Sequence, residues 1–132
     1  MIRLSKRADY GLIAIRHLGR LTDGTCRSAR EIAAEYSIPP ALLAKLLQRL
    51  ARVGLVDSLH GTKGGYQLAR PASQIAVRDV IEAIEGKVAL VECQDGRKGE
   101  CPQLCTCPIE RPLRLVQERI EAILGSTMVS EL

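Results

Sequence analysis

The stretch from residue 28 to residue 70 constrains the fold of this chain more than any other. It opens on SARE (28–31), in which the serine side chain can cap a helix and the glutamate can reach back, a pattern known as a capping box. The turn SIPP (37–40) follows, and two prolines suit the first turn of the next helix, where no amide partner is needed. That helix, ALLAKLLQRLARV, ends at Gly54, a good left-handed cap. Two helices joined by a tight turn are therefore predicted.

A β-hairpin is predicted directly after these helices. LVDSL (55–59) and YQLAR (66–70) have the composition of strands, and the Gly-rich HGTKGG (60–65) can turn between them. Before the two helices, apolar residues at helical spacing predict a further helix over 6–21, capped by Ser5. The order helix, short helix, turn, helix and hairpin is typical of a winged helix-turn-helix, whose third helix enters the major groove of DNA. The predicted fold class is mainly α with a small β-hairpin wing.

The second half of the chain predicts two more helices with a cysteine-rich loop between them. VRDVIEAIE (77–85) is amphipathic, and a last helix runs from about residue 108 or 112 to residue 125. With 132 residues the chain is a single domain with one appended element. We therefore expect a winged helix-turn-helix domain over 1–86, a cysteine-rich loop over 87–107, and a long helix with its tail over 108–132.

Charge and composition narrow the class of protein. Residues 1–70 carry twelve Lys and Arg against five Asp and Glu, whereas residues 71–132 carry seven against ten, so the first half suits a polyanion. A basic surface that faces only solvent would give the same count. No stretch approaches the length of a membrane span, and the N-terminus does not resemble a secretory signal, so we expect a cytoplasmic protein. No acid, base or nucleophile constellation indicates an enzyme.

The helix after SIPP is predicted to read DNA. Small residues on one face would let the helix approach the bases, and Gln48 can pair with a base edge. An ordinary amphipathic helix with a polar solvent face would show the same pattern. The residues expected to pack inward are Leu43, Leu46, Leu47, Leu50 and Val53. The DNA-contacting residues expected on this helix are Ala41, Ala44, Lys45, Gln48, Arg52 and, at the margin, Arg49.

Two neighbouring segments complete the predicted DNA interface. The glycines of GTKGGY allow a close backbone approach, and its basic residues could reach a minor groove or a phosphate. A plain hairpin turn is the alternative reading of this stretch. The start of the second helix could hold a phosphate through its free amides. The expected contacts are His60, Thr62, Lys63 and Gly64 in the turn, and Arg27, Ser28 and Arg30 at the helix start.

Four of the five cysteines lie in CQDGRKGECPQLCTCP (93–108). Their spacing lacks the C-x2-C pairs of structural zinc sites and of ferredoxins, and a disulfide framework is not expected in a reducing cytosol. A loop of thiolates can instead hold an iron–sulfur cluster. Redox-active thiols without metal, a zinc-stabilised interaction module, an electron-transfer protein and unligated cysteines remain alternatives. Cys26 lies apart and is expected to be a half-buried packing thiol.

The chain resembles the IscR/NsrR family of bacterial iron–sulfur-cluster winged-helix regulators over essentially its whole length. The matching stretches are RLSKRADYGLIAI, EIAAEYSIPPALLAKLLQRLARVGLVDSLHGTKGGYQLARP and IAVRDVIEAIEG, followed by the cysteines and the terminal helix. Among subgroups it is most similar to the regulator of the SUF cluster-assembly system. One departure concerns Ala44, which stands where the best-known cluster-assembly regulator has an operator-sensing Glu, so the operator sequence is not carried over.

The resemblance implies a set of cluster ligands. The family's three cysteines, the last two separated by five residues, match Cys93, Cys101 and Cys107, which leaves Cys105 as an extra thiol. For the fourth ligand, the family pattern points first to Asp9, supplied by the partner subunit. The substitutes are Glu110, at the position of a family histidine, and Cys105. Of the two common cluster types, 2Fe–2S is expected in preference to 4Fe–4S.

The resemblance also implies a homodimer joined by its long last helix. The apolar stripe expected at that contact is Leu113, Val116, Ile120, Ile123 and Leu124. A two-fold dimer would bind a pseudo-palindromic DNA operator. The function implied is a repressor, with no membrane or small-molecule substrate, whose operator affinity depends on a cluster that senses iron, redox state or nitric oxide. Genes of iron–sulfur cluster assembly are its expected targets.

Overall fold

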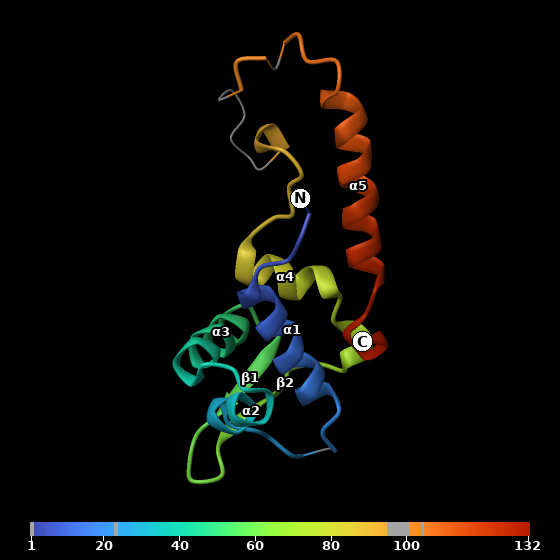
Figure 1. The fold of residues 1–132 in the computed structure, drawn as a ribbon. Coiled ribbons are helices and arrows are strands. Elements are labelled where there is room, and N and C mark those ends of the chain that lie inside the picture. Colours follow the sequence, from blue (N-terminus) through green and yellow to red (C-terminus); the bar gives the residue numbers. More distant parts are fainter. Residues whose placement is uncertain (1, 23, 95–100, 104) are drawn as a thin grey trace.

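The computed structural model describes residues 2–22, 24–94, 101–103 and 105–132. Over these ranges the chain forms five α-helices and one antiparallel hairpin, which confirms the predicted winged helix-turn-helix (Figure 1). No helix in the described ranges is long and apolar enough to span a membrane. The elements are α1 (Lys6–Gly19), α2 (Ala29–Tyr36), α3 (Pro40–Arg52), β1 (Val56–Leu59), β2 (Gly65–Leu68), α4 (Val77–Glu85) and α5 (Glu110–Ser126).

Side-chain caps explain where the first helices begin. The Ser5 hydroxyl accepts from the Ala8 amide at 3.2 Å, and the Ser28 hydroxyl accepts from the Glu31 amide at 3.1 Å, so each satisfies a free amide of a first turn. The Glu31 carboxylate accepts from the Ser28 hydroxyl, whereas the capping box predicted a bond to the backbone. Helix α1 ends at Gly19, two residues earlier than predicted.

The tight turn between α2 and α3 depends on one left-handed residue. Ser37 has φ 56° and ψ 41°, and the amide of Ile38 then donates to the Ala33 carbonyl at 2.9 Å. The Ile38 side chain is buried, and Pro40 opens α3. This turn fixes α3 against the other helices with one face toward solvent.

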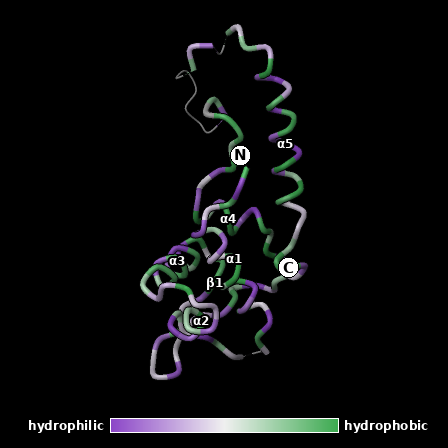
Figure 2. The backbone as a smooth tube through the Cα atoms, in the orientation of Figure 1, coloured by the Kyte–Doolittle hydropathy of each residue, from purple (hydrophilic) through white to green (hydrophobic). Residues whose placement is uncertain are grey.

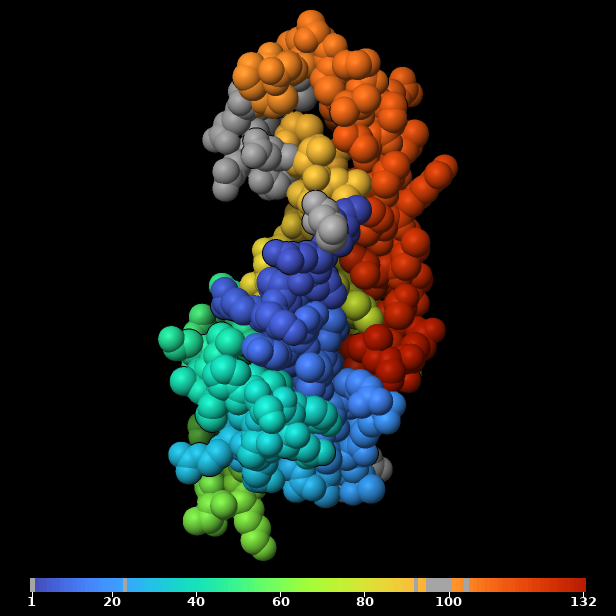
Figure 3. All heavy atoms as spheres, viewed as in Figure 1, coloured from blue at the N-terminus to red at the C-terminus, as the bar shows by residue number. Residues whose placement is uncertain are grey.

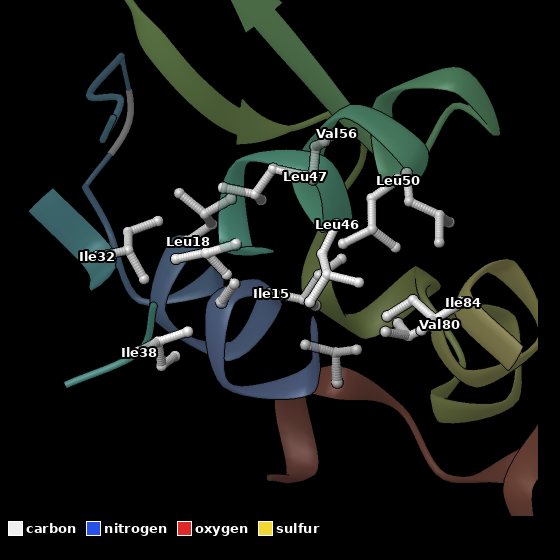
Figure 4. Close-up of a cluster of buried hydrophobic side chains, with 14 of the residues drawn as sticks. Ile15, Leu18, Ile32, Ile38, Leu46, Leu47, Leu50, Val56, Val80 and Ile84 are labelled. Carbon is white, nitrogen blue, oxygen red and sulfur yellow. The ribbon is translucent and has the colours of Figure 1, made fainter. Parts of the chain in front are cut away.

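The core is aliphatic and lies where α1, α3 and α4 meet the root of the wing (Figure 4). One face of α3 is fully inside it, with Leu43, Leu46, Leu47 and Leu50 all inaccessible to solvent. The predicted inward position of Val53 is wrong, because its side chain is 55% exposed. Helix α3 ends at Arg52, so the helical spacing that turns the leucines inward does not reach residue 53.

Helix α5 runs along one side of the molecule and extends beyond the helix cluster (Figures 1 and 3). Its C-terminal end is anchored there, because the Val77 amide donates to the Thr127 carbonyl and the Val129 amide donates to the Ile75 carbonyl, both at 2.8 Å. Val129 is buried in the core. The cysteine segment is residues 93–107. Its described part lies at the opposite end of α5, and the wing tip lies at the far end of the molecule.

Candidate nucleic-acid interface and cysteine segment

The solvent face of α3 carries the residues predicted to read DNA. Lys45, Gln48 and Arg52 are exposed, Ala41 is exposed at the start of the helix, and Ala44 is half-buried between them. The apolar face of the same helix is held in the core, so α3 is positioned rigidly while these side chains remain free. Such a helix can enter a major groove and present donors and acceptors to base edges.

Arg49 has an intramolecular partner that the sequence analysis did not predict. Its Nη1 atom donates to the carbonyl oxygen of Ile84 at 3.0 Å. Ile84 lies in the last turn of α4, where carbonyl groups have no partner within their own helix. The guanidinium therefore joins α3 to the end of α4.

The wing is fastened to the start of α2 by backbone pairing. The Arg27 amide donates to the Tyr66 carbonyl at 3.0 Å, and the Tyr66 amide donates to the Arg27 carbonyl at 2.7 Å. Gly65 permits this contact, because a Cβ atom there would lie 2.5 Å from the Arg27 carbonyl carbon. Cys26 is half-buried, as predicted, and its Sγ donates to the Lys63 carbonyl at 3.1 Å. The helix start and the wing thus form one surface.

The wing tip leaves its polar groups exposed. His60, Thr62 and Lys63 face solvent, while the Gly64 amide donates to the Gly61 carbonyl at 3.0 Å and closes the turn. In Figure 1 the tip projects beyond α2, at the end of the molecule remote from the cysteine segment.

At the start of α2, two of the three residues predicted to contact DNA already have partners within the protein. Arg27 is exposed but lies 3.5 Å from the Glu31 carboxylate, so its charge is partly paired within the helix. Arg30 is exposed, and Ser28 is engaged as the helix cap. A phosphate at this site would have to compete with Glu31 for Arg27.

The cysteine segment contains free thiols of unequal exposure. Cys93, Cys101 and Cys107 are half-buried, and Cys105 is exposed. Residues 95–100 and residue 104, which belong to the predicted loop of 87–107, lie outside the described residues. Among the residues that are described, no three His, Cys, Asp or Glu side chains gather closely enough to hold a metal ion. The donor set itself is suited to iron, because iron–sulfur clusters require soft thiolates.

The two carboxylates predicted as fourth ligands differ in their surroundings. Asp9 lies in the first turn of α1 with its side chain 43% exposed, and within the described residues its carboxylate forms a 3.9 Å ion pair with Lys6. Glu110 begins α5 and is hydrogen-bonded to Arg114, and this bond raises the pKa of the Arg114 guanidinium. Glu110 would have to leave Arg114 to bind metal. Asp9 is the more available donor, although α1 lies well away from the cysteine segment of its own chain (Figure 1).

The apolar stripe predicted on α5 is largely uncovered. Val116 is 42% exposed and Ile123 is 64% exposed, and Leu113, Ile120 and Leu124 are half-buried. Ile109, just before the helix, extends the stripe and is 56% exposed, which the sequence analysis missed. Figure 2 shows these hydrophobic positions recurring along α5. A pocket of about 660 Å³ opens beside the stripe, lined by Leu4, Ile81, Val88, Ile120 and Leu124 among others.

One protein family matches almost the entire chain. Residues 4–132 match Rrf2, described as an iron-dependent transcriptional regulator. The chain belongs to the Rrf2 family. It is a DNA-binding transcriptional regulator, and the expectation that it is not an enzyme is confirmed by this family description. The resemblance inferred from the sequence is therefore confirmed at the level of the family.

One curated relative and two solved structures are similar to the chain over nearly its whole length. Protein aau3 of Rhizobium meliloti (strain 1021) is 30% identical over 131 residues, which cover 99% of this chain and 84% of that protein. CymR, the global cysteine regulator of B. subtilis, is 27% identical with a TM-score of 0.79, covering 99% of this chain and 95% of that one. IscR of T. potens is 25% identical with a TM-score of 0.77, covering 98% and 85%.

Proposed function

We propose that this regulator is a cytoplasmic homodimer that binds a pseudo-palindromic operator with an affinity set by an iron–sulfur cluster. The observation that carries the proposal is the position of the cysteine segment. Four thiols lie between residues 93 and 107, directly before a helix whose apolar face is uncovered. A change in this segment is therefore transmitted to the helix that would join two subunits. We assign the protein to repression of cluster-assembly genes in response to iron, redox state or nitric oxide.

DNA recognition follows from the two exposed surfaces. Helix α3 enters the major groove, where Gln48 contacts a base edge and Lys45 and Arg52 contact bases or phosphates. The wing tip, with His60 and Lys63, reaches the adjacent minor groove or backbone. The domain formed by residues 1–86 supplies both surfaces. Two copies related by a two-fold axis would contact half-sites about 10 bp apart.

Dimerisation gives the apolar stripe of α5 a partner. An exposed apolar face of this length is unfavourable in a monomer. In the dimer, residues 108–132 of the second subunit, which form the same helix and its tail, cover this face. Ile120 and Leu124 line the pocket beside the stripe, so the second copy also has a cavity to fill. A symmetric contact between two identical helices satisfies both copies at once.

The proposed cluster ligands are those that the resemblance to the IscR/NsrR family implies. Cys93, Cys101 and Cys107 supply three thiolates, and Asp9 of the partner subunit supplies a carboxylate, with Glu110 or Cys105 as substitutes. A bound 2Fe–2S cluster would supply a redox-active, iron-dependent charge at this site. A carboxylate is a harder ligand than a thiolate, so its bond to iron is the more labile one, which suits a sensor.

Anaerobic purification followed by absorbance, iron and sulfide analysis tests the cluster. We expect a coloured protein that loses iron and colour when Cys93, Cys101 and Cys107 are each replaced by Ser, while Cys26→Ser keeps both. Binding of the loaded and the metal-free protein to DNA selected by the wild-type protein should differ. A colourless protein that takes up no iron on reconstitution would refute the cluster.

A metal-free thiol sensor is the second candidate function. Cys105 is exposed and separated by one residue from Cys107, so two thiols lie close together in the sequence. In this case an oxidant would change the DNA affinity of protein that contains no iron, and a thiol reductant would reverse the change. Cluster-dependent regulation requires iron for the same change.

A further inference from the structure

Residues 84–90, called here the junction segment, connect the end of α4 to the cysteine segment and are hydrogen-bonded to side chains from three other parts of the fold. The Arg49 side chain of α3 donates to the Ile84 carbonyl. The hydroxyl of Ser5, which caps α1, donates to the Glu85 carboxylate. The Gln117 side chain of α5 bonds to the backbone of residues 88 and 90. Side chains from α3, from the N-cap of α1 and from α5 therefore each hold a different residue of the stretch that leads into the cysteine segment.

Gln117 is the most unusual residue of this set. It is the one buried residue of α5, only 5% exposed, although the helix carries exposed apolar residues on either side of it. Its Nε2 group donates to the Val88 carbonyl and to the Glu121 carboxylate, the latter at 2.7 Å, and its Oε1 atom accepts from the Leu90 amide at 2.8 Å. A carboxamide carries both a donor and an acceptor, so it satisfies both backbone groups.

Gln117 thereby fixes the junction segment against α5. Burying a side-chain amide without hydrogen-bond partners is costly. Any arrangement of residues 88–90 that breaks these contacts would leave the buried amide unpaired, so the contacts favour the arrangement seen. Leu90 lies three residues before Cys93. A displacement of Cys93 that is carried back along residues 91 and 92 to Leu90 would move or break the Gln117 contacts.

Arg49 holds the other end of the junction segment. The Ile84 carbonyl belongs to the last turn of α4, and a cation there satisfies a free acceptor and favours the helix dipole. Gly86 ends the helix with φ 83°, and the chain then turns into residues 87–90. The reading helix is thus tied to the same short stretch that Gln117 holds.

We infer that Gln117 and Arg49 form a link that transmits the state of the cysteine segment through residues 84–90 to the reading helix. Arg49 is then a positioning residue and not a phosphate contact. The link rests on the proposed function, since it requires that the cysteine segment change state. The physical basis is contiguous hydrogen bonding between a sensing segment and α3, which two states of the segment can bias differently.

Binding measurements on two variants test the link. The full-length wild-type protein, Gln117→Leu and Arg49→Met are each titrated, metal-free and reduced or reconstituted with iron and sulfide, against one duplex selected by the wild-type protein. Allosteric coupling is typically about 5–150-fold in affinity. The measured quantity is the ratio of DNA affinities between the cluster-loaded and the metal-free protein. We expect this ratio to fall to about 2-fold or less in both variants. Glu118→Gln, an exposed change on α5, should keep the wild-type ratio.

The salt dependence of binding separates the two roles of Arg49. Log affinity falls with log salt, and loss of one phosphate contact decreases the steepness of this fall by about 1. Lys45→Met, an exposed cation on the same helix, should show this decrease, and Arg49→Met should keep the wild-type slope. A decreased slope together with an unchanged ratio in Arg49→Met would assign Arg49 to DNA contact and overturn its place in the link.

Hydrogen exchange gives a readout that needs neither DNA nor iron. In the metal-free reduced protein, the Leu90 amide should be protected in the wild type and exchange at least 10-fold faster in Gln117→Leu. Gln117→Met provides a second variant if the first unfolds, because it is similar in length and loses both the acceptor for the Leu90 amide and the donor to the Val88 carbonyl. Equal exchange in the wild type and both variants would overturn the Gln117 contact.

The failures are distinguishable. A wild-type protein whose two states bind DNA equally would refute the proposed function, and the link with it. A regulated wild type whose ratio persists in both variants would refute the link alone.

Discussion

Gly65 shows how a single missing side chain sets the position of the wing. A Cβ atom at this residue would lie 2.5 Å and 2.6 Å from the carbonyl carbon and oxygen of Arg27, closer than side chains are found. The backbone of Arg27 cannot retreat without breaking its paired hydrogen bonds to Tyr66. The absence of a side chain is therefore a condition for the contact between the wing and the start of α2.

We expect Gly65→Ala to destabilise the protein by about 1–3 kcal/mol, the usual cost of forcing an extra methyl group into a packed site. Urea unfolding followed by circular dichroism measures the loss. Thr62→Ala, at the exposed wing tip, is the control and should change the free energy of unfolding by less than about 0.5 kcal/mol. Equal stability of Gly65→Ala and the wild type would mean that the contact with Arg27 is not tight.

At the residue scale, local signals were predictable and distant ones were not. Ser28 was recognisable as a helix cap because its partner is three residues away in the sequence. The bond of Arg49 to Ile84 spans 35 residues, and that of Gln117 to Leu90 spans 27. Such contacts depend on how helices pack, so the sequence placed Arg49 on the DNA-reading face and gave Gln117 no role.

Among the elements, α3 has the clearest separation between a buried face and an exposed face. Four of its five leucines are fully buried, whereas Gln48 and Arg52 face solvent four residues apart. A helix fixed on one side by the core loses little entropy when its other side binds, which favours specific recognition. The apolar spacing made this division predictable, apart from Val53 beyond the helix end.

The double variant Gln48→Ala with Arg52→Ala should lose most of its preference for the selected operator. Each good bidentate contact to a base contributes about 1–3 kcal/mol of discrimination, so the affinity ratio between operator and random DNA should fall at least about 10-fold. Fluorescence anisotropy at one stated salt concentration measures both affinities. Arg119→Ala, exposed on α5, changes the charge without touching α3 and should keep the ratio. Unchanged preference in the double variant would exclude this face of α3 from base reading.

Helix α5 shows what periodicity can and cannot predict about an element. The apolar spacing predicted a helix to residue 125, close to its end at Ser126. The pairing of residues 127–129 with residues 75–77 was not predicted, because no local pattern identifies a partner 50 residues away. This pairing anchors the end of α5 on the reading domain. A displacement at the cysteine end of α5 therefore acts on a helix that is fixed at its other end.

On the scale of the whole molecule, the two functional surfaces lie at opposite ends of one chain. The wing tip and the cysteine segment are separated by the helix cluster, and α5 runs along its side (Figure 1). The sequence predicted each part but not this separation, because distance follows from packing and not from spacing. If the cysteine segment is the proposed sensor, it must act on the DNA-binding end through the elements between, and α5 and the junction segment are the described elements that adjoin the cysteines.

Because the apolar stripe of α5 is uncovered, one substitution that introduces a charge there tests whether the stripe forms the dimer contact. Ile123 is 64% exposed, so glutamate there leaves the fold of the subunit intact while burying a carboxylate in any helix-to-helix contact. We expect Ile123→Glu to raise the dimer dissociation constant by at least about 30-fold, equivalent to about 2 kcal/mol, as measured by analytical ultracentrifugation. Operator affinity should fall with it, because a monomer contacts only one half-site. Ala122→Glu adds the same charge at an exposed position beside the stripe and should leave the dimer unchanged. If Ile123→Glu stays as dimeric as Ala122→Glu, the subunits meet through a different surface and the stripe requires another partner.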